Sequence, residues 1–238
     1  MERSVVPSEI DNPSAPPQGS DANDDIGYAL KADIKHYFDN VDHRILLGMV
    51  QHKVRDPHVL WLVKLILEHH KTVVPGKGMP LGNMTSQFFA NVYLDELDQF
   101  VKHTLKARYY IRYVDDFVIL HRDRGQLRRW EEEIAAFLHE RLGLELHPEK
   151  SKIIPLREGI TLLGFRVFYH HRLLKKSNAR RIWKRLEKLK QGHDRGEVSR
   201  EEVVQSLEGW LAYAGFADSY NLRRKVVARF NELFGSKK

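Results

Sequence analysis

The sequence predicts an α+β fold, in which a mixed core of strands and helices is followed by a small helical domain. The mixed core is indicated by short runs rich in β-branched and aromatic residues, at 28–34 and 111–120, between longer segments with apolar residues at helical spacing. The helical domain is indicated by the last 60 residues, which carry helical spacing throughout. At 238 residues, 42% of them hydrophobic, the chain is long enough to bury a substantial core.

The elements of the core do not follow the regular alternation of a parallel α/β sheet. Asp42 marks the start of one helix, and Asp56 precedes a proline, which is tolerated in the first turn of another. The segment 130–142 repeats apolar residues at helical spacing and ends at Gly143. The other expected elements are a strand at 28–34, helices at 41–54, 56–70 and about 85–105, and hairpins at 111–120 and 160–176.

Three helices are predicted in the C-terminal region. Ser177 can cap the first, which should end before Gly192. Ser199 and Glu202 form a capping box at the start of the second. Apolar residues from 222 to 233 mark the third.

The composition excludes several classes of protein. Residues 1–25 hold four Pro, four Ser, six acids, one base and no aromatic residue, so this acidic tail is predicted to be disordered. No membrane partner is expected, because the chain has neither an 18-residue apolar run nor the apolar stretch of a signal peptide. With no cysteine, disulfides, thiolate zinc sites and cysteine nucleophiles are excluded, which fits a cytoplasmic protein.

The positive charge is concentrated in one segment. The chain carries a net charge of +7, and residues 166–190 hold ten Lys or Arg and one acid, so the remainder is at −2. A localised basic stripe favours a polyanionic partner such as nucleic acid. The alternative is an ordinary solvated helix face.

Two adjacent carboxylates, Asp115 and Asp116, lie between the apolar halves of the hairpin at 111–120. A simple surface turn would explain them, but Asp33 also stands at the end of a predicted strand. Three carboxylates on neighbouring strands would offer the oxygen donors that Mg²⁺ prefers. Two such ions can activate an attacking hydroxyl and stabilise a leaving phosphate oxygen.

Five segments resemble the palm motifs of reverse transcriptases, in the same order and spacing. They are "ADIKHYF", "GMPLGNMTSQFFANVYLDELD", "YVDD", "GLELHPEKSKI" and "LLGFRV". The helical C-terminus resembles the thumb of these enzymes, so the resemblance covers residues 28–238. The form "LGNMTSQ", with Gln87 where many relatives carry proline, is most similar to the enzymes of diversity-generating retroelements.

The resemblance implies a palm with an antiparallel sheet and packed helices at 26–174, and a three-helix thumb at 175–238. Only 32 residues precede Asp33, so the fingers subdomain of the family is expected to be reduced or missing. The helices between 41 and 70 are interpreted as residual fingers. Whether the chain acts alone is left open by this departure, and an accessory protein or fingers supplied in trans is a possible partner.

The implied activity is that of an RNA-directed DNA polymerase. It would add deoxynucleoside triphosphates to a primer 3′-hydroxyl on template RNA, hold the RNA/DNA duplex, and use two Mg²⁺ ions, with Mn²⁺ as a substitute. Two alternatives stay open: a non-catalytic RNA-binding protein that keeps the palm for structural reasons, and untemplated DNA synthesis like that of defence-associated relatives.

The family pattern assigns roles to particular residues. Asp33, Asp115, Asp116 and the backbone carbonyl of Ile34 would be the metal ligands. Lys150 would donate a proton to pyrophosphate, although Lys152, the second lysine of the "HPEKSK" segment, is a close competitor for this role. The other alternative is that Lys150 is an ordinary surface lysine.

The nucleotide and template residues follow by position in the motifs. Phe38 would lie under the sugar and exclude a 2′-hydroxyl, unless it is an ordinary core aromatic. Gly82 would allow close approach of the backbone to the nascent pair, and Gln87 would touch the template or the nucleotide.

Residues near the end of the palm and on the first thumb helix would hold the primer and the duplex. Leu163, Gly164 and Phe165 match the hairpin that grips the primer end. Basic side chains of the first thumb helix are expected to contact phosphates without regard to sequence. They are Arg180, Arg181, Lys184, Arg185 and Lys188.

Overall fold

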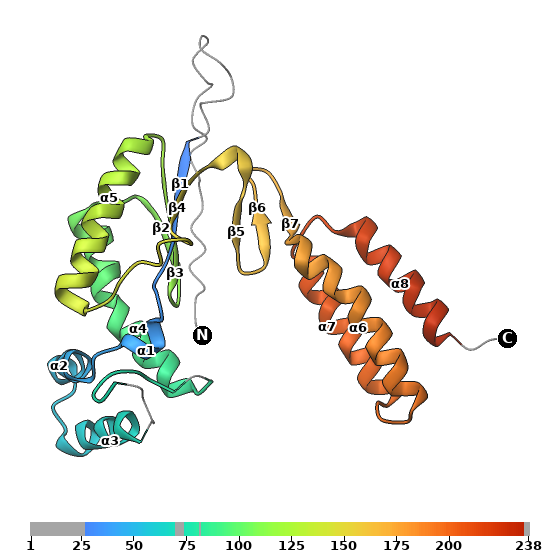
Figure 1. Cartoon of the computed structure of the whole chain (residues 1–238), viewed down its shortest axis with the longest axis horizontal. Helices are drawn as coiled ribbons and strands as arrows, with labels where there is room; N and C mark the ends of the chain where they lie inside the picture. The colour runs from blue at the N-terminus through green and yellow to red at the C-terminus, as the bar shows by residue number, and fades with distance from the viewer. Residues whose placement is uncertain (1–26, 70–73, 81, 236–238) are drawn as a thin grey trace, which may run out of the picture.

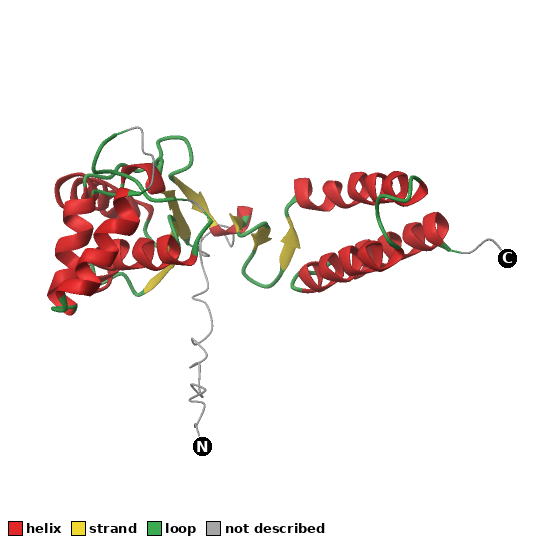
Figure 2. Ribbon diagram, turned by 90° about the horizontal axis from the view of Figure 1, so that it is seen from below, coloured by secondary structure: helices red, strands yellow, loops and turns green. Residues whose placement is uncertain are grey.

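The structure is a computed structural model, and it describes residues 27–69, 74–80 and 82–235. The predicted disordered tail at 1–25 lies outside the described residues. Figures 1 and 2 show two lobes joined by a small sheet: an N-terminal lobe of helices around a four-stranded sheet, and a lobe of C-terminal helices. The predicted α+β class is therefore confirmed.

The N-terminal lobe contains a four-stranded sheet and the helices that pack on it. Its strands are β1 (Tyr28–Asp33), β2 (Tyr109–Tyr113), β3 (Asp116–His121) and β4 (Lys152–Pro155). Its α-helices are α1 (Tyr37–Asn40), α2 (His43–Lys53), α3 (Pro57–Glu68), α4 (Met84–Gln99) and α5 (Arg124–Phe137). The last two continue as π-helical turns at η1 (Phe100–Thr104) and η2 (Leu138–Leu142).

The remainder of the chain forms the connecting sheet and the C-terminal helices. A 3₁₀ turn, η3 (Leu156–Glu158), leads into β5 (Ile160–Leu162), β6 (Phe165–Val167) and β7 (Arg172–Leu174). The helices are α6 (Lys176–Asp194), α7 (Arg200–Gly215) and α8 (Tyr220–Phe234).

The four-stranded sheet is antiparallel, in the order β2-β3-β1-β4. Side chains alternate between the two faces of a strand, so Leu30 and Ala32 point into the core while Lys31 and Asp33 lie on the opposite face. The core face is covered by α4 and α5. On the other face, Ile160 of β5 covers Ala29 and Val118, so the part around Lys31 and Asp33 is left for a binding site.

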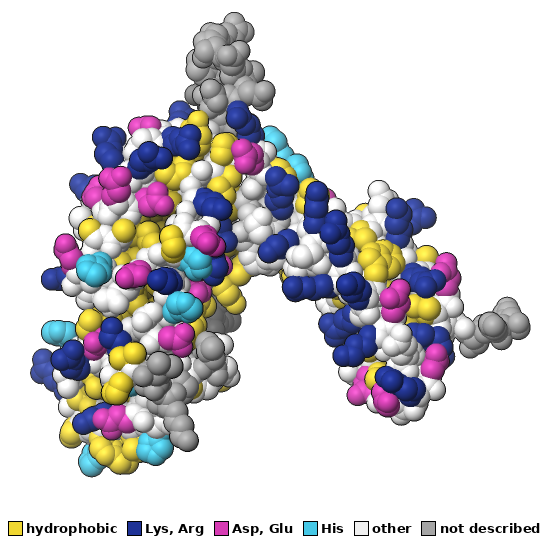
Figure 3. All heavy atoms as spheres, in the orientation of Figure 1, with side chains coloured by type: hydrophobic (Ala, Val, Ile, Leu, Met, Phe, Trp, Pro, Cys, Tyr) yellow, Lys and Arg dark blue, Asp and Glu magenta, His cyan; other side chains and the backbone are white. Residues whose placement is uncertain are grey.

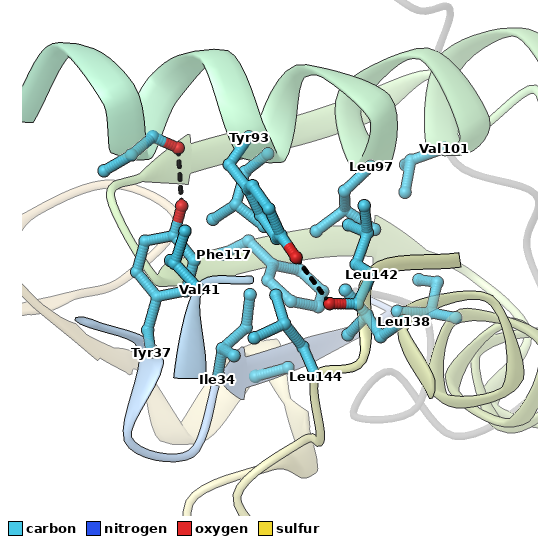
Figure 4. Close-up of a cluster of buried hydrophobic side chains, with 14 of the residues drawn as sticks. Ile34, Tyr37, Val41, Tyr93, Leu97, Val101, Phe117, Leu138, Leu142 and Leu144 are labelled. Carbon is cyan, nitrogen blue, oxygen red and sulfur yellow. Dashed lines mark hydrogen bonds between the residues drawn. The ribbon is translucent and has the colours of Figure 1, made fainter. Parts of the chain in front are cut away.

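Two tyrosines inside the core tie separate elements together (Figure 4). The Tyr37 hydroxyl donates to the carbonyl of Ala90 in α4 at 2.7 Å, and the Tyr93 hydroxyl donates to the carbonyl of Leu142 at 2.7 Å. Burial raises the pKa of Tyr93 to about 12, so the hydroxyl keeps its proton. These bonds fix α4 relative to α1 and to the end of η2.

Three groups of buried apolar side chains stabilise the described part of the chain. The largest joins the sheet to α2, α3, α4 and α5, and a second joins α6, α7 and α8. The third consists of Ala29, Val118 and Ile160, and it packs β5 against the other face of the sheet. The helices interpreted as residual fingers, α2 and α3, share the largest group with the sheet. Their assignment and the domain limits at 174 and 175 stay predictions. Among the described helices, none has the length and apolar content needed to cross a membrane.

The caps predicted for several helices are confirmed. The Asp42 side chain accepts from the backbone N–H of Arg44 at the start of α2, and Asp56 caps α3 with a proline in its first turn. Ser199 and Glu202 form both bonds of the capping box that begins α7.

Three predictions in the C-terminal half are wrong. Residues 160–176 form a three-stranded sheet rather than a hairpin, because β7 pairs with β6. Ser177 is not the cap of α6, because the Lys175 amide is bonded to the Gly164 carbonyl and the helix starts one residue earlier than Ser177. Gly192 lies inside α6, where the Val198 side chain packs against it closely enough to exclude a Cβ.

Candidate active site

The adjacent aspartates lie at the tip of the β2–β3 hairpin. Tyr113 pairs with Asp116, so Val114 and Asp115 form a two-residue turn. Of these two, only Val114 has a positive φ, at 56°. This is the pattern of a type II′ turn, which matches the twist of a hairpin and usually has glycine at its first central position.

The third aspartate comes from the neighbouring strand. Asp33 pairs with Asp116 across β1 and β3, and its side chain is nearly buried. The backbone N–H of Ile34 donates to the carbonyl of Asp115 at 3.2 Å. The fold therefore brings together the three carboxylates that the sequence singled out, over a separation of more than 80 residues.

Two lysines face these carboxylates. The Lys150 ammonium donates to both oxygens of Asp33, at 3.0 and 3.2 Å. The Lys31 ammonium lies 3.4 Å from Oδ1 of Asp116. That oxygen is buried, and within the described part of the chain it has no hydrogen-bond partner, so the contact with Lys31 is an ion pair without hydrogen-bond geometry.

The crowding of like charges shifts the protonation of the site. Burial, and then repulsion by Asp33 and Asp116, raises the pKa of Asp115. The hydrogen bond to Asp33 raises the pKa of Lys150, so its ammonium keeps a proton at neutral pH.

The donor set fits a hard divalent cation. Within the described residues, no three His, Cys, Asp or Glu side chains are already arranged as a metal site. Asp33 is turned toward Lys150 instead, while Asp116 keeps a buried oxygen with no hydrogen bond. These carboxylate oxygens repel one another, and one of them is an acceptor without a hydrogen bond. Mg²⁺ or Mn²⁺ would neutralise this repulsion and use the oxygens as ligands.

A cavity of about 480 Å³ opens beside the aspartates. Its lining comes from β1, from the β2–β3 turn, from the first turn of α4 and from the β5–β6 turn. Seven of its lining residues were predicted from the sequence. They are Phe38, Gly82, Gln87, Asp115, Asp116, Leu163 and Gly164.

Other predicted residues lie around this cavity. Phe38 is half-buried, and its ring meets that of Tyr37 edge-on at 5.3 Å. Gly82 has a φ of +91°, which explains a glycine there, and Gln87 is exposed in the first turn of α4. The ring of Phe165 packs on Tyr213 at 4.8 Å rather than lining the cavity.

The turn between β5 and β6 is bound to the C-terminal helices. Leu163 and Gly164 both have positive φ, as in a type I′ turn. The Gly164 carbonyl accepts from the backbone N–H of Lys175 at 2.9 Å, the Tyr213 hydroxyl at 3.1 Å and the Asn178 amide at 3.3 Å. One backbone carbonyl therefore joins the cavity wall to α6 and α7.

The basic residues predicted on the first C-terminal helix share an exposed face of α6. Arg180, Arg181, Lys184, Arg185 and Lys188 are all exposed, while Ile182 and Leu186 are buried against α7 and α8. Figure 3 shows the surface hollowed between the two lobes, with Lys and Arg side chains gathered on the lobe of C-terminal helices.

Sequence reasoning missed two basic residues of the cavity wall. Lys31 stands two residues before Asp33, and in a strand this spacing places both side chains on one face, so the alternation could have identified it. Lys175 gave no such signal, because its place beside the cavity goes with a bond between its amide and the distant Gly164 carbonyl.

Comparison with known proteins adds the family. The model of the family "Reverse transcriptase (RNA-dependent DNA polymerase)" matches residues 11–167, which is more than half of the chain. The chain belongs to the reverse transcriptase family. The four-stranded sheet with α4 and α5 is accordingly the palm, and α6, α7 and α8 are the thumb.

Curated members of this family resemble the chain over part of their length. Protein YkfC of Escherichia coli K12 is 27% identical, over 63% of this chain and 47% of that protein. The group II intron-encoded protein LtrA of Lactococcus lactis subsp. cremoris is 25% identical, over 57% of this chain and 34% of that protein. The chain thus spans less than half the length of either relative.

Solved structures show the same fold. The apo telomerase of Candida tropicalis superposes with a TM-score of 0.56 at 12% identity, covering 89% of this chain and 44% of that one. The telomerase of Candida albicans, in complex with a TWJ fragment of telomeric RNA, gives a TM-score of 0.52 at 14% identity, over 87% and 39% of the two chains. At these identities the likeness concerns the fold alone.

Proposed function

We propose that this reverse transcriptase is an RNA-directed DNA polymerase, which adds deoxynucleotides to a primer 3′-hydroxyl. The observation that carries the proposal is the meeting of Asp33, Asp115 and Asp116 at the edge of a cavity lined by Phe38 and Gly82. The "LGNMTSQ" segment further suggests an enzyme of the diversity-generating retroelement type.

The carboxylates of Asp33, Asp115 and Asp116, with the carbonyl of Ile34, would hold two Mg²⁺ ions, for which Mn²⁺ would substitute. Bound there, the ions would lower the pKa of the primer hydroxyl and neutralise charge on the α-phosphate. The protein's own part is to hold these ligands on two rigid strands and to keep like charges close until cations arrive.

Lys150 is proposed to act on the leaving group. Its ammonium donates to both oxygens of Asp33, and a lysine carries its proton at neutral pH whether or not this bond is made. The side chain is about half exposed, so it can leave Asp33 and donate a proton to pyrophosphate.

The remaining cavity residues would position the nucleotide, the primer and the duplex. Phe38 would lie under the sugar, Gln87 would meet the templating strand or the nucleotide, and the turn at Leu163 and Gly164 would hold the primer end. The basic face of α6 would bind phosphates of the RNA/DNA duplex. The description of the matching family, an RNA-dependent DNA polymerase, supports an RNA template.

A primer-extension assay with and without template RNA tests the proposed function. Templated synthesis of complementary DNA from deoxynucleotides would support it. Addition that ignores the template sequence would favour an untemplated DNA polymerase instead. RNA binding without any nucleotide addition, in Mg²⁺ and in Mn²⁺, would favour the non-catalytic RNA-binding protein.

Phe38→Ala is expected to lower the preference for deoxynucleotides over ribonucleotides, within the roughly 10- to 200-fold range that pocket shape supplies. The physical reason is steric, because the shorter side chain leaves room for a 2′-hydroxyl. The measurement is kcat/KM for each nucleotide. Phe100→Ala is the control, since it removes another half-buried ring, which stacks on Phe137 away from the cavity. An unchanged ratio with reduced stability would identify Phe38 as a core aromatic.

Neutralising Lys184, Arg185 and Lys188 together to Gln is expected to weaken primer–template binding and to reduce the slope of log K against log salt by up to about three. All three side chains are exposed on α6. The matched control replaces three exposed arginines on α5, at 124, 128 and 129, because α5 covers the opposite face of the sheet. If the parent and the α6 variant show the same dependence of log K on log salt, the basic face of α6 is exposed to solvent and does not bind phosphates.

A further inference from the structure

Arg112 lies at the end of β2 and holds three different groups. Its guanidinium makes a bidentate contact with Asp98, at 2.8 Å from Nε and 2.6 Å from Nη2. Nη1 donates to the carbonyl of Val114 at 2.9 Å and to the side-chain oxygen of Asn91 at 3.2 Å. The side chain is only 8% exposed, so its contacts with Asp98 and with the Val114 carbonyl are largely shielded from water.

The side chains that accept hydrogen bonds from Arg112 are held in place by α4. Asp98 and Asn91 both belong to α4, and the Tyr110 hydroxyl donates to Oδ1 of Asp98 at 2.6 Å. Helix α4 is fixed in turn by the bond between Tyr37 and the carbonyl of Ala90. The Arg112 guanidinium therefore connects a fixed helix to the turn of the β2–β3 hairpin.

The turn needs such a connection because its backbone is strained. Val114 has a φ of 56°, in the left-handed region that is unfavourable for an L-residue, and a β-branched side chain is especially unfavourable there. Strain of this kind persists only where the surrounding structure imposes it. The one side-chain donor on the Val114 carbonyl among the described residues is Arg112.

The position of Asp115 depends on the same turn. Asp115 follows Val114 directly, and its carbonyl accepts the Ile34 N–H at 3.2 Å, on the strand that carries Asp33. A relaxed turn would move Asp115 away from Asp33 and lengthen this bond.

We propose that Arg112 is a positioning residue, which holds the strained Val114 turn so that the Asp115 carboxylate stays beside Asp33. Its consequence for nucleotide addition rests on the proposed function, but its effect on the turn does not. Arg112 does not line the cavity, and it contacts neither Asp33 nor Asp116. It therefore acts on the site through the backbone of the turn alone.

Amide hydrogen exchange of Ile34 reports on the turn without metal, nucleotide or nucleic acid. Arg112→Lys keeps a positive charge beside Asp98. It removes the planar guanidinium, which can bond to Asp98 and to the Val114 carbonyl simultaneously. Because a hydrogen bond from a charged donor is worth about 1.5–3 kcal/mol, exchange at Ile34 should become at least roughly tenfold faster. The amides of Lys35 and His147, bonded to Glu145 and to the Asp33 carbonyl, should keep their rates.

Val114→Gly supplies the decisive comparison, because glycine adopts a positive φ without strain. In the glycine background, Arg112→Lys should change the exchange of Ile34 less than about threefold, since the turn no longer needs to be held. If primer extension is active, its kcat should follow the same non-additive pattern. Arg129→Lys, on the exposed surface of α5, is the control for an arginine replaced elsewhere.

Equal effects of Arg112→Lys in the valine and glycine backgrounds would overturn the proposal, as would faster exchange at all amides alike. If Arg112→Lys does not fold, Tyr110→Phe makes the same comparison, because it releases one bond to Asp98 without removing a charge. If Tyr110→Phe speeds the exchange of Ile34 equally in the valine and glycine backgrounds, the proposal is overturned as well. Inactivity of the parent enzyme would count against the proposed function alone, since the exchange measurement needs no activity.

Discussion

Asp115→Asn is expected to reduce nucleotide addition by about three orders of magnitude, which corresponds to roughly 4 kcal/mol of lost transition-state stabilisation. Asp115 is the carboxylate that neither lysine of the site contacts, and burial together with its two like-charged neighbours raises its pKa. An amide in its place removes the charge that would hold a cation. Asp33→Asn should have an effect of the same size, because it removes the ligand from the other strand.

The affinity for primer–template duplex should stay within a few-fold in both variants. The basic face of α6 lies on the thumb, apart from the aspartates, and supplies contacts that do not depend on the metal. Primer extension under single-turnover conditions and a binding titration measure the two properties separately. Asp95→Asn, an equal change on the exposed side of α4, is the control. Normal extension by both Asp115→Asn and Asp33→Asn would remove the two-metal assignment.

Gly164→Ala is expected to destabilise the folded protein by about 2–5 kcal/mol, from the cost of a positive φ together with overpacking. The φ of Gly164 is +84°, and a Cβ there would stand 2.3 Å from the Tyr213 hydroxyl and 2.6 Å from the Asn178 amide nitrogen. These are the groups that donate to its carbonyl. The added methyl would therefore push the thumb away from the turn that lines the cavity.

Gly196→Ala separates the two contributions to this loss. Its φ of +73° carries a similar backbone cost, but in the described part of the chain, apart from its two sequence neighbours, no atom lies within 4 Å of the added Cβ. Urea unfolding of both variants should show the larger loss at Gly164, and primer extension should fall only in that variant. Equal losses at the two glycines would mean that the contacts with Tyr213 and Asn178 contribute nothing beyond the backbone term.

Much of the site could be predicted from short-range sequence pattern. Asp115 and Asp116 were expected at a turn because carboxylates interrupt an apolar hairpin, and they lie where the pairing of β2 with β3 ends. The helix starts at Asp42 and Asp56 followed from local side-chain caps. Such features depend on residues within a few positions of one another, so the sequence displays them directly. The catalytic roles of these residues stay predictions.

Contacts between distant segments were not visible in this way. The start of α6 is set by a bond from Lys175 to Gly164, and the ion pair of Asp116 comes from a strand more than 80 residues away. The Arg112 network likewise joins a strand to a helix through a side chain that reads, in the sequence, as one more arginine between apolar residues.

By itself the sequence determined the α+β class, the periodicity of each helix and strand, the order of the family motifs and the position of the basic stripe. The tertiary structure alone decided which lysine faces which aspartate, which turn is strained, and where the thumb is attached to the palm. The physical reason is that periodicity and capping arise from neighbours along the chain, whereas ion pairs and backbone strain depend on elements that meet only after packing.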